Sequence, residues 1–455
     1  MRTVLAHAVV LTVDEERRIL VDGAVAWDEK GTLVAVGASD EVLAGLGDEA
    51  EVVDCRGRVL APGFVDAHVH LGEQLARGLV PDHAGPFEWL PDWLLPMYAA
   101  LTPEDERLNA ELAIAEMLLT GTTTFCEAGT AIDWEAAADA VDATGIRGQL
   151  GRWTWDLPER PERLRAPSVE AALRENRKLV EGVRARRCPR LSPAVILWGL
   201  GTCSSDLMRE AKLLANDLGV PLAMMWASVA PEHGGPVLPA DELEKLGWLD
   251  GRTKLTHAVY LTLKEVELLA AAGVRVAHCP TAALRHIKGI SRHGLFPEML
   301  ERGVAVGLGA DSANGSNHLN MLTCTYLAAT LYKDFRMDST MVPPETALEM
   351  ATLHGARCLG LERKIGSLEP GKRADLIVFS TEHPEWRPLL HPVQNLVLNA
   401  SDRSLEAVYV EGRKLVEDGR LLTIDLPAVL ERADRASGAL LDRIGMSAPW
   451  AWPRR

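Results

Sequence analysis

Closely spaced cysteines are missing from this 455-residue sequence. Its seven cysteines are scattered from Cys55 to Cys358, their number is odd, and no two of them form a CxxC motif. This pattern predicts neither a disulfide framework nor a cysteine-based zinc site. It favours a reducing compartment, for which the cytoplasm is the default.

Long apolar runs are also lacking. No stretch approaches the roughly 18 uninterrupted apolar residues that a membrane helix needs. The apolar start MRTVLAHAVVLTV is interrupted by His7 and continues into strand-like sequence. We therefore expect this segment to be a retained strand rather than a signal peptide, and the protein to be soluble, without a membrane partner.

Blocks of basic residues are absent as well. The net charge is −16, and 48 basic and 64 acidic residues are interleaved along the chain. Because binding phosphates requires a clustered basic surface, nucleic acid is excluded as the expected partner. A small neutral or cationic molecule fits this charge better. The hydrophobic share of 47% is that of an ordinary globular protein with a substantial core.

The two ends of the sequence have the same pattern of strand-like runs and turns. Short β-branched runs alternate with Asp, Gly and Glu turns in both. Neither end alone has enough strands to bury both faces of a sheet. We therefore predict that residues 1–62 pair with residues 361–425 in one composite β-sandwich. The remaining residues 426–455 have a helical pattern and are predicted to form a C-terminal tail.

Between these ends, residues 63–360 alternate buried strand-like runs with helical patterns. The runs include VILWGLGT, VPLAMMWAS, KLTHAVY and VAVGLGADS. Strands separated by crossover helices imply a parallel sheet, and so many units predict a closed barrel. The expected fold class is α/β, a (β/α)₈ TIM barrel with catalytic residues at the carboxyl ends of its strands.

The motif GFVDAHVHL places two histidines at the end of the first strand of this barrel. Residues two apart in a strand point to the same side, so His68 and His70 present two imidazoles to one point. Such a pair can bind a divalent metal. HxH alone is common by chance, and its position at a strand end after a Pro-Gly turn is what favours a metal site.

Asp311 ends another hydrophobic strand, in VAVGLGADSANGSN. A carboxylate there can bind a metal and accept a proton from water. The alternative is a loop or helix-capping aspartate. His257 in KLTHAVY and His278 in VRVAHCP also end strands, where a lone histidine is more often a structural hydrogen bonder.

Several segments together resemble one protein family. PGFVDAHVHL, GTTTF, LTHAVYLT, AHCPTA, GLGADSANGSN and IGSLEPGKRADLIVF are similar to the amidohydrolase superfamily, in the branch of triazine hydrolases, guanine deaminase and S-adenosylhomocysteine-type deaminases. The resemblance implies that His68, His70 and Asp311 bind a metal and that His257 orients substrate or water. It also implies a β-sandwich built from both chain ends, and a homodimer or larger assembly.

One departure from that family stands at the fifth strand. Relatives carry a pattern like HxHxxE there, whereas this chain has VPLAMMWASVAP, with Met225 at the histidine and Ser228 at the glutamate. A thioether is a poor zinc ligand compared with imidazole. Three outcomes are open: His257 becomes a direct ligand, His233 reaches in from its loop, or the site is vestigial. We favour His257, because a strand end is held more firmly.

A substrate pocket is expected around the strand ends. Tryptophans outnumber phenylalanines by twelve to six, and several fall near these strand ends. Two interpretations are open: the tryptophans form a flat apolar pocket, or they simply pack helices on the barrel. The residues expected to line the pocket are Gln74, Trp89, Trp93, Glu127, Trp155, Met225, Ser228 and His286.

The expected activity is hydrolysis of a small neutral molecule by metal-activated water. One divalent ion is expected, zinc first, with iron, manganese and cobalt as alternatives. Asp311 and His257 are the catalytic candidates, and the bond attacked is C–N or C–Cl of an aromatic or heteroaromatic substrate. Hydrolysis of an amide, urea or carbamate is the competing activity. An inactive binding or assembly homologue is the third reading, against which the four convergent ligands argue.

Overall fold

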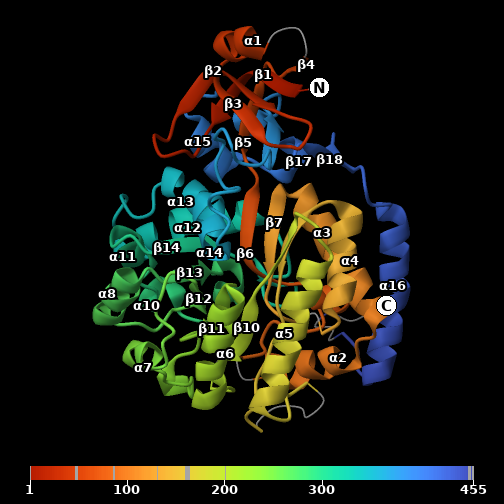
Figure 1. Cartoon of the computed structure of the whole chain (residues 1–455), viewed down its shortest axis with the longest axis vertical. Coiled ribbons are helices and arrows are strands. Elements are labelled where there is room, and N and C mark those ends of the chain that lie inside the picture. The colour runs from red at the N-terminus through yellow and green to blue at the C-terminus, as the bar shows by residue number, and fades with distance from the viewer. Residues whose placement is uncertain are drawn as a thin grey trace.

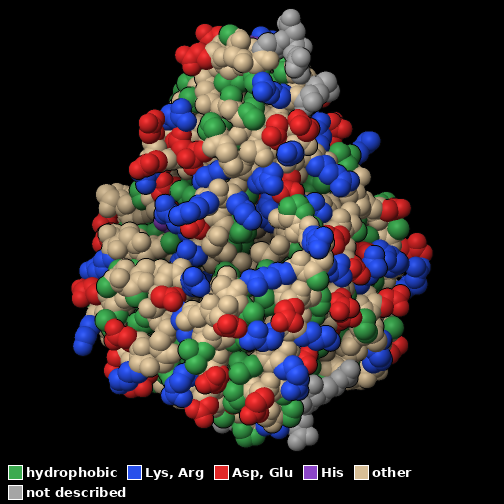
Figure 2. Space-filling view, viewed as in Figure 1, with side chains coloured by type: hydrophobic (Ala, Val, Ile, Leu, Met, Phe, Trp, Pro, Cys, Tyr) green, Lys and Arg blue, Asp and Glu red, His purple; other side chains and the backbone are tan. Residues whose placement is uncertain are grey.

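The computed structural model describes residues 2–46, 50–85, 88–130, 132–158, 164–199, 201–448 and 452. A small β-rich unit stands above a barrel, and its strands come from both ends of the colour scale (Figure 1). Acidic and basic side chains are interleaved over most of the face in Figure 2. Among the described residues, no helix is both long and apolar enough to cross a membrane.

The β-rich unit joins the two ends of the chain in one sheet. The strand order is β19-β18-β17-β16-β5-β1-β2-β3, with β4 paired to β1. β5 and β16 make the junction as an antiparallel pair, with Pro62 opposite Leu376. The amino-terminal strands are β1 (Arg2–Leu11), β2 (Ile19–Trp27), β3 (Leu33–Ala38), β4 (Ala50–Asp54) and β5 (Arg58–Pro62). The carboxyl-terminal strands are β16 (Leu376–Ser380), β17 (Leu405–Val410), β18 (Arg413–Glu417) and β19 (Arg420–Leu421).

This sheet folds over a shared core. Trp27 of β2 and Tyr409 of β17 meet edge to face with ring centroids 5.3 Å apart, although β16, β5 and β1 lie between their strands. The same cluster buries Leu5, Leu60 and Leu376. The predicted composite sandwich is thus confirmed as one sheet that curves around an apolar centre, with α1 (Ser39–Leu46) beside β2 and β3.

The barrel is built from two runs of parallel strands, β15-β6-β7-β8-β9 and β10-β11-β12-β13-β14. Ala194 alone separates β9 from β10, and only Gly309 and Ala310 separate β14 from β15, so the two runs close into a ring. Counting β9 with β10 and β14 with β15 as single strands gives the eight strands of the barrel. This confirms the predicted TIM barrel. Its strands are β6 (Phe64–His70), β7 (Thr122–Glu127), β8 (Arg147–Leu150), β9 (Leu191–Pro193), β10 (Val195–Gly199), β11 (Leu222–Trp226), β12 (Thr253–His257), β13 (Arg275–His278), β14 (Ala305–Leu308) and β15 (Asp311–Ser312).

Helices follow the strands and are started by local capping. Thr102 and Asp105 form a capping box at α3, with Pro103 as its first residue, and Thr262 and Glu265 do the same at α8. The longer helices are α3 (Pro103–Leu119), α4 (Trp134–Thr144), α5 (Val169–Ala185), α6 (Ser205–Leu218), α8 (Leu263–Ala272), α12 (Met321–Arg336), α13 (Pro344–Ala351) and α14 (Leu353–Leu359). The shorter ones are α2 (Leu95–Ala100), α7 (Ala240–Lys245), α9 (Pro280–Arg285), α10 (Ile290–His293), α11 (Phe296–Glu301) and α15 (Pro392–Gln394).

The last helix, α16 (Leu426–Ile444), runs down the side of the barrel in Figure 1 and packs on α3 and α2. Arg432 and Arg443 pair with Glu111 and Asp105 of α3. The division into residues 1–62 with 361–425, 63–360 and 426–455 stays a prediction.

Candidate metal and active site

Two strand ends meet to form the site. β15 pairs in parallel with β6, so that Asp311 lies opposite Val69. The buried carboxylate of Asp66 accepts the N–H of His68 at 3.1 Å and that of Ala310 at 3.2 Å, which ties the strands together. Gly309 permits this approach, because a Cβ there would lie 2.8 Å from the His68 carbonyl oxygen. Asp311 itself has a φ of +65°, a strained conformation that functional sites often hold.

The two oxygens of Asp311 face different partners. Oδ1 lies 3.2 Å from His70 Nε2 and 3.9 Å from His68 Nε2. Oδ2 lies 3.9 Å from His257 Nε2. Ligand atoms of His68, His257 and Asp311 lie within 4.8 Å of one another, and these three side chains and that of His70 are buried. The sequence-predicted ligands therefore converge.

The donor atoms fit a divalent metal. His68 Nδ1 lies 3.3 Å from the Thr256 hydroxyl, whereas its Nε2 is buried and has no hydrogen-bond partner among the described residues. An outer partner of this kind orients a ligating imidazole. His68, His70 and Asp311 make a set of two imidazoles and one carboxylate, which catalytic zinc sites use with one position left open. The site thus has the chemistry of a metal centre even without a fifth-strand histidine.

The charge states of Asp311, His68 and His257 suit metal binding, whereas at His70 burial is outweighed by the hydrogen bond with Asp311, which raises the pKa. Burial would raise the pKa of Asp311, but Lys288 and the hydrogen bond from His70 outweigh it and hold that pKa well below its usual range. Burial above all lowers the pKa values of His68 and His257. The carboxylate is therefore ionised and these two imidazoles are neutral, the forms in which both bind metals.

The fifth-strand position is apolar, as the sequence indicated. Met225 pairs in register with Thr256 of β12 and packs in the apolar cluster that contains Trp153 and Trp198. Ser228 is buried just beyond β11. The side chain of His233, the other proposed substitute ligand, lies outside the described part of the structure.

Tryptophans line one side of the site. Trp153 meets His70 edge to face at 5.0 Å and stacks on Trp198 at 4.8 Å, with 7° between the rings. Trp155 lies behind them, edge-on to Trp198 at 4.5 Å. A cavity of about 20 Å³ between Tyr98, Trp153 and Trp155 has room for one water molecule. Trp155 is therefore in a second layer, and Trp153 is nearer to the ligands.

Trp89 and His286 close another side, stacked at 4.5 Å with 17° between their rings. Both were expected at the pocket. Burial lowers the pKa of His286 to about 3, so its imidazole is neutral. Its Nε2 is buried and unpartnered among the described residues.

Gln74 and Glu127 lie beside the site, but their polar atoms already form hydrogen bonds with neighbouring segments of the chain. Gln74 donates to the His70 carbonyl at 3.3 Å and accepts from Arg77. Glu127 accepts from the Thr130 hydroxyl at 2.6 Å and from neighbouring backbone N–H groups. Trp93 is half-buried against the apolar cluster near α2. These three shape the pocket more than they present free groups to it.

His278, the other strand-end histidine, packs against side chains of α11 and α12. It lies 3.2 Å from the Tyr332 hydroxyl and stacks on Phe296 at 3.8 Å. It is a structural hydrogen bonder, the role that a lone strand-end histidine most often has.

Sequence reasoning missed Lys288. Its Nζ lies 3.2 Å from His257 Nε2 and 3.8 Å from Asp311 Oδ2. The residue follows the short helix α9, and nothing in the sequence pattern says which way that turn points. A buried network of Tyr98, Glu73 and Asn314 was also missed. Its only signal was the position of Glu73, three residues after His70.

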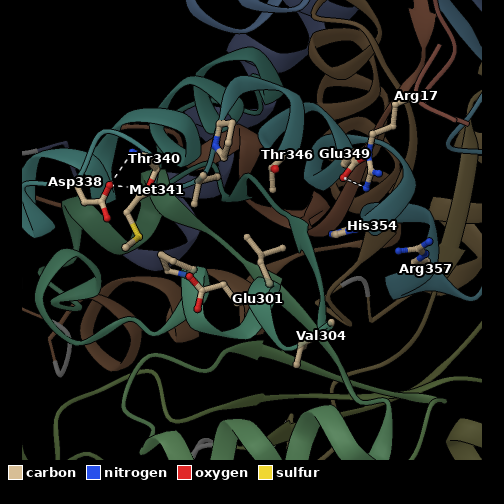
Figure 3. A pocket seen from close by; sticks show the side chains of 15 residues that line it. Arg17, Glu301, Val304, Asp338, Thr340, Met341, Thr346, Glu349, His354 and Arg357 are labelled. Atoms are coloured by element: carbon tan, nitrogen blue, oxygen red, sulfur yellow. Dashed lines mark hydrogen bonds and ion pairs between the residues drawn. The ribbon is translucent and has the colours of Figure 1, made fainter. Parts of the chain in front are cut away.

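A second cavity, of about 430 Å³, lies elsewhere (Figure 3). Val304, which lines it, directly precedes β14, so the cavity is at the amino end of that strand, away from Asp311. Arg17 reaches into it and pairs with Glu349. In TIM barrels that face serves stability rather than catalysis.

The comparisons with known proteins agree with this geometry. The model of the amidohydrolase family matches residues 59–415. A 5-methylthioadenosine/S-adenosylhomocysteine deaminase of Nitratidesulfovibrio vulgaris is 34% identical over 443 residues, 96% of this chain and 97% of that protein. A 5'-deoxyadenosine deaminase of Methanothermobacter thermautotrophicus is 32% identical and covers 87% of this chain and 90% of its own length.

Solved structures show the same fold. An adenosine deaminase of Xanthomonas campestris with bound zinc has a TM-score of 0.87 and 28% identity, with 97% of this chain and 98% of that chain covered. A triazine hydrolase of Arthrobacter aurescens has a TM-score of 0.86 and 25% identity, with coverages of 97% and 99%. The chain belongs to the amidohydrolase family and is a hydrolase that acts on carbon–nitrogen bonds other than peptide bonds.

Proposed function

We propose that this hydrolase uses one zinc ion and releases an amino group, or another nitrogen-linked group, from a small aromatic or heteroaromatic molecule. The observation that carries the proposal is the convergence of His68, His70, His257 and Asp311 at the carboxyl ends of barrel strands. Zinc is supported by the ion in the related adenosine deaminase.

In this proposal His68, His70 and Asp311 hold the ion, and His257 takes the place of the missing fifth-strand histidine. Zinc held by these residues would supply a Lewis acid that activates water and polarises the bond to be hydrolysed. Oδ2 of Asp311, which faces away from His68 and His70, accepts the proton of the attacking water. His257 borders that oxygen, and Trp153 and Trp89 flank the site, so that a flat ring is held between aromatic side chains.

A second candidate is hydrolysis of an amide, urea or carbamate. Ser228 favours it, because the glutamate that would carry a proton to a leaving amine is replaced there. Substrates that need less help with the leaving group suit such a site. An inactive homologue is disfavoured by the unpartnered Nε2 of His68 among the described residues.

Metal analysis of the purified protein tests the proposal. We expect about one zinc ion per chain, and loss of nearly all of it in His68→Ala. His257→Ala is expected to lose most of the ion as well. Met225→His restores an imidazole and is expected to raise zinc affinity about tenfold. His391→Ala, at an exposed position, is the matched control.

The proposal is wrong if the protein binds no zinc, manganese, iron or cobalt after reconstitution. Full metal retention in His257→Ala would show that His257 is not a ligand. A cytoplasmic location and a homodimer are further parts of the proposal. The first is supported by seven cysteines that are all free.

A further inference from the structure

Lys288 is buried by an unusual turn after α9. The neighbouring Ile287 has a φ of +46°, a conformation that is an outlier for a β-branched residue. Ile287 is 72% exposed, whereas Lys288 is only 7% exposed. The turn thus places an apolar side chain in water and a charged one inside, which is unfavourable for both. Hydrophobicity therefore does not explain why the turn buries Lys288.

The ammonium group of Lys288 is poorly satisfied where it lies. Lysine has three donors, yet its partners among the described residues are His257 Nε2 at 3.2 Å and Asp311 Oδ2 at 3.8 Å. The lone pair of His257 Nε2 serves either Lys288 or a metal, but not both. When His257 binds a metal, only the distant carboxylate oxygen remains.

Lys254 shows what a satisfied buried lysine looks like in the same barrel. Its Nζ donates to the Ala67 carbonyl at 2.6 Å and lies 3.0 Å from Cys126 Sγ. Lys288 has no comparable carbonyl partner in the described structure. Its spare donors are therefore available to a ligand.

The charge of the reacting centre points to the kind of ligand. Ser228 removes the negative charge that the HxHxxE pattern places at the site, and the structure brings the ammonium group of Lys288 to 3.8 Å from Asp311 Oδ2. The centre therefore has one negative charge fewer than that pattern provides, and it also contains a buried cation. The overall negative charge of the protein does not cancel this locally, because exposed charges are screened beyond about 8–10 Å.

We propose that Lys288 binds a negatively charged group of the substrate, and that the substrate is a small aromatic or heteroaromatic carboxylate with its acid group beside the hydrolysed C–N bond. The proposal rests on the proposed function for the location of that bond. Trp89, stacked on His286 two residues before Lys288, supplies an adjacent aromatic surface for the ring. A carboxylate accepts two of the free N–H donors in charge-assisted hydrogen bonds.

Binding of benzoate and benzamide to the zinc-loaded protein tests this proposal, because the two probes share shape and differ in charge. Isothermal titration is expected to show benzoate binding at least about tenfold more tightly than benzamide. Lys288→Met should abolish that preference and keep its zinc, and Lys288→Arg should retain part of it. Lys264→Met, at an exposed position of α8, should behave as the wild type.

Three results would overturn the proposal. The first is that the wild type shows no preference for benzoate. The second is that Lys288→Met keeps the preference, because the metal alone holds the carboxylate. The third is that Lys288→Met loses its zinc, which would make Lys288 a support of the metal site. Repeating the titration after chelation separates the two hypotheses. A preference that depends on Lys288 in a protein that never binds metal would uphold carboxylate binding by Lys288, while the proposed zinc enzyme and the location of the hydrolysed bond would be wrong.

Discussion

Two buried ion pairs of this molecule differ in how well they are satisfied. At the seam between barrel and sandwich, Arg147 of β8 is 3% exposed and Asp375 is 1% exposed. Arg147 Nε and Nη2 donate to the two carboxylate oxygens of Asp375 at 2.9 and 3.0 Å, and the Glu411 N–H donates to the same carboxylate at 2.8 Å. At the active site, Lys288 and Asp311 are 3.8 Å apart without such geometry.

The difference separates structural from functional charges. The bidentate pair of Arg147 and Asp375 holds the barrel and the sandwich together. Loss of either partner leaves the other as an unpaired buried charge. A loosely placed ammonium contributes little to stability and remains free to bind a ligand. Both pairs are buried. The pair of Lys288 and Asp311 is therefore distinguished by its incomplete hydrogen bonding, and not by how deeply it is buried.

The largest expected effect is at the seam. Arg147→Met leaves Asp375 buried without its cation and is expected to lower the free energy of unfolding by about 3–5 kcal/mol. Arg56→Met breaks the exposed pair with Asp54 and should cost at most about 1 kcal/mol. Urea unfolding measures both. A loss below about 1 kcal/mol for Arg147→Met would remove the basis of the comparison.

An intermediate effect on the free energy of unfolding is expected from His278, a buried histidine that is neutral in the folded protein. Burial lowers the pKa of His278 to about 3 from 6.5, so the unfolded chain binds a proton between these values and the folded chain does not. Stability is therefore complete above pH 6.5 and falls as the pH drops toward 3. His278 should account for about 2 kcal/mol of the loss between pH 7 and pH 5.

His278→Gln is expected to remove that share of the pH dependence, whatever its effect at pH 7. Urea unfolding at the two pH values measures it, and His83→Gln at an exposed position is the control. An unchanged difference in the variant would assign the acid sensitivity to other groups.

The smallest effect is expected at Lys288. With metal removed by a chelator, Lys288→Met should change the free energy of unfolding by less than about 1 kcal/mol, because the variant loses a weak pair and also the desolvation cost of an ammonium. Asp311 keeps the hydrogen bond from His70. A loss as large as that of Arg147→Met would show that Lys288 is a structural residue, and the two pairs would then not differ in kind.

The parts of the site that repeat along strands were predictable from sequence. His68 and His70 share one side of β6 because alternate strand residues do, and Asp311 ends a strand because an apolar run stops there. Met225 and Ser228 were visible through their spacing from KLTHAVY. The composite sheet was predictable because neither end of the chain suffices alone.

What could not be predicted depends on turns and on contacts between strands. The turn at Ile287 buries Lys288 and exposes an isoleucine, the reverse of what hydrophobicity indicates. The stack of Trp153 on Trp198 joins residues from different strands, and no local pattern sets their registration. The same holds for Arg147 and Asp375, which are far apart in sequence and meet only when the sandwich docks on the barrel.

The pairing of β5 with β16 has a consequence for synthesis of the chain. Hydrogen-bonding groups of β5 that β16 will cover are exposed until the entire barrel has left the ribosome, since β16 follows it. At roughly 5–20 residues per second, that wait is on the order of tens of seconds. During it the nascent chain presents an open apolar strand edge, a template for wrong pairing between chains. Slow translation of the barrel would lengthen this exposure, so aggregation during expression should depend on codon speed between β6 and β14.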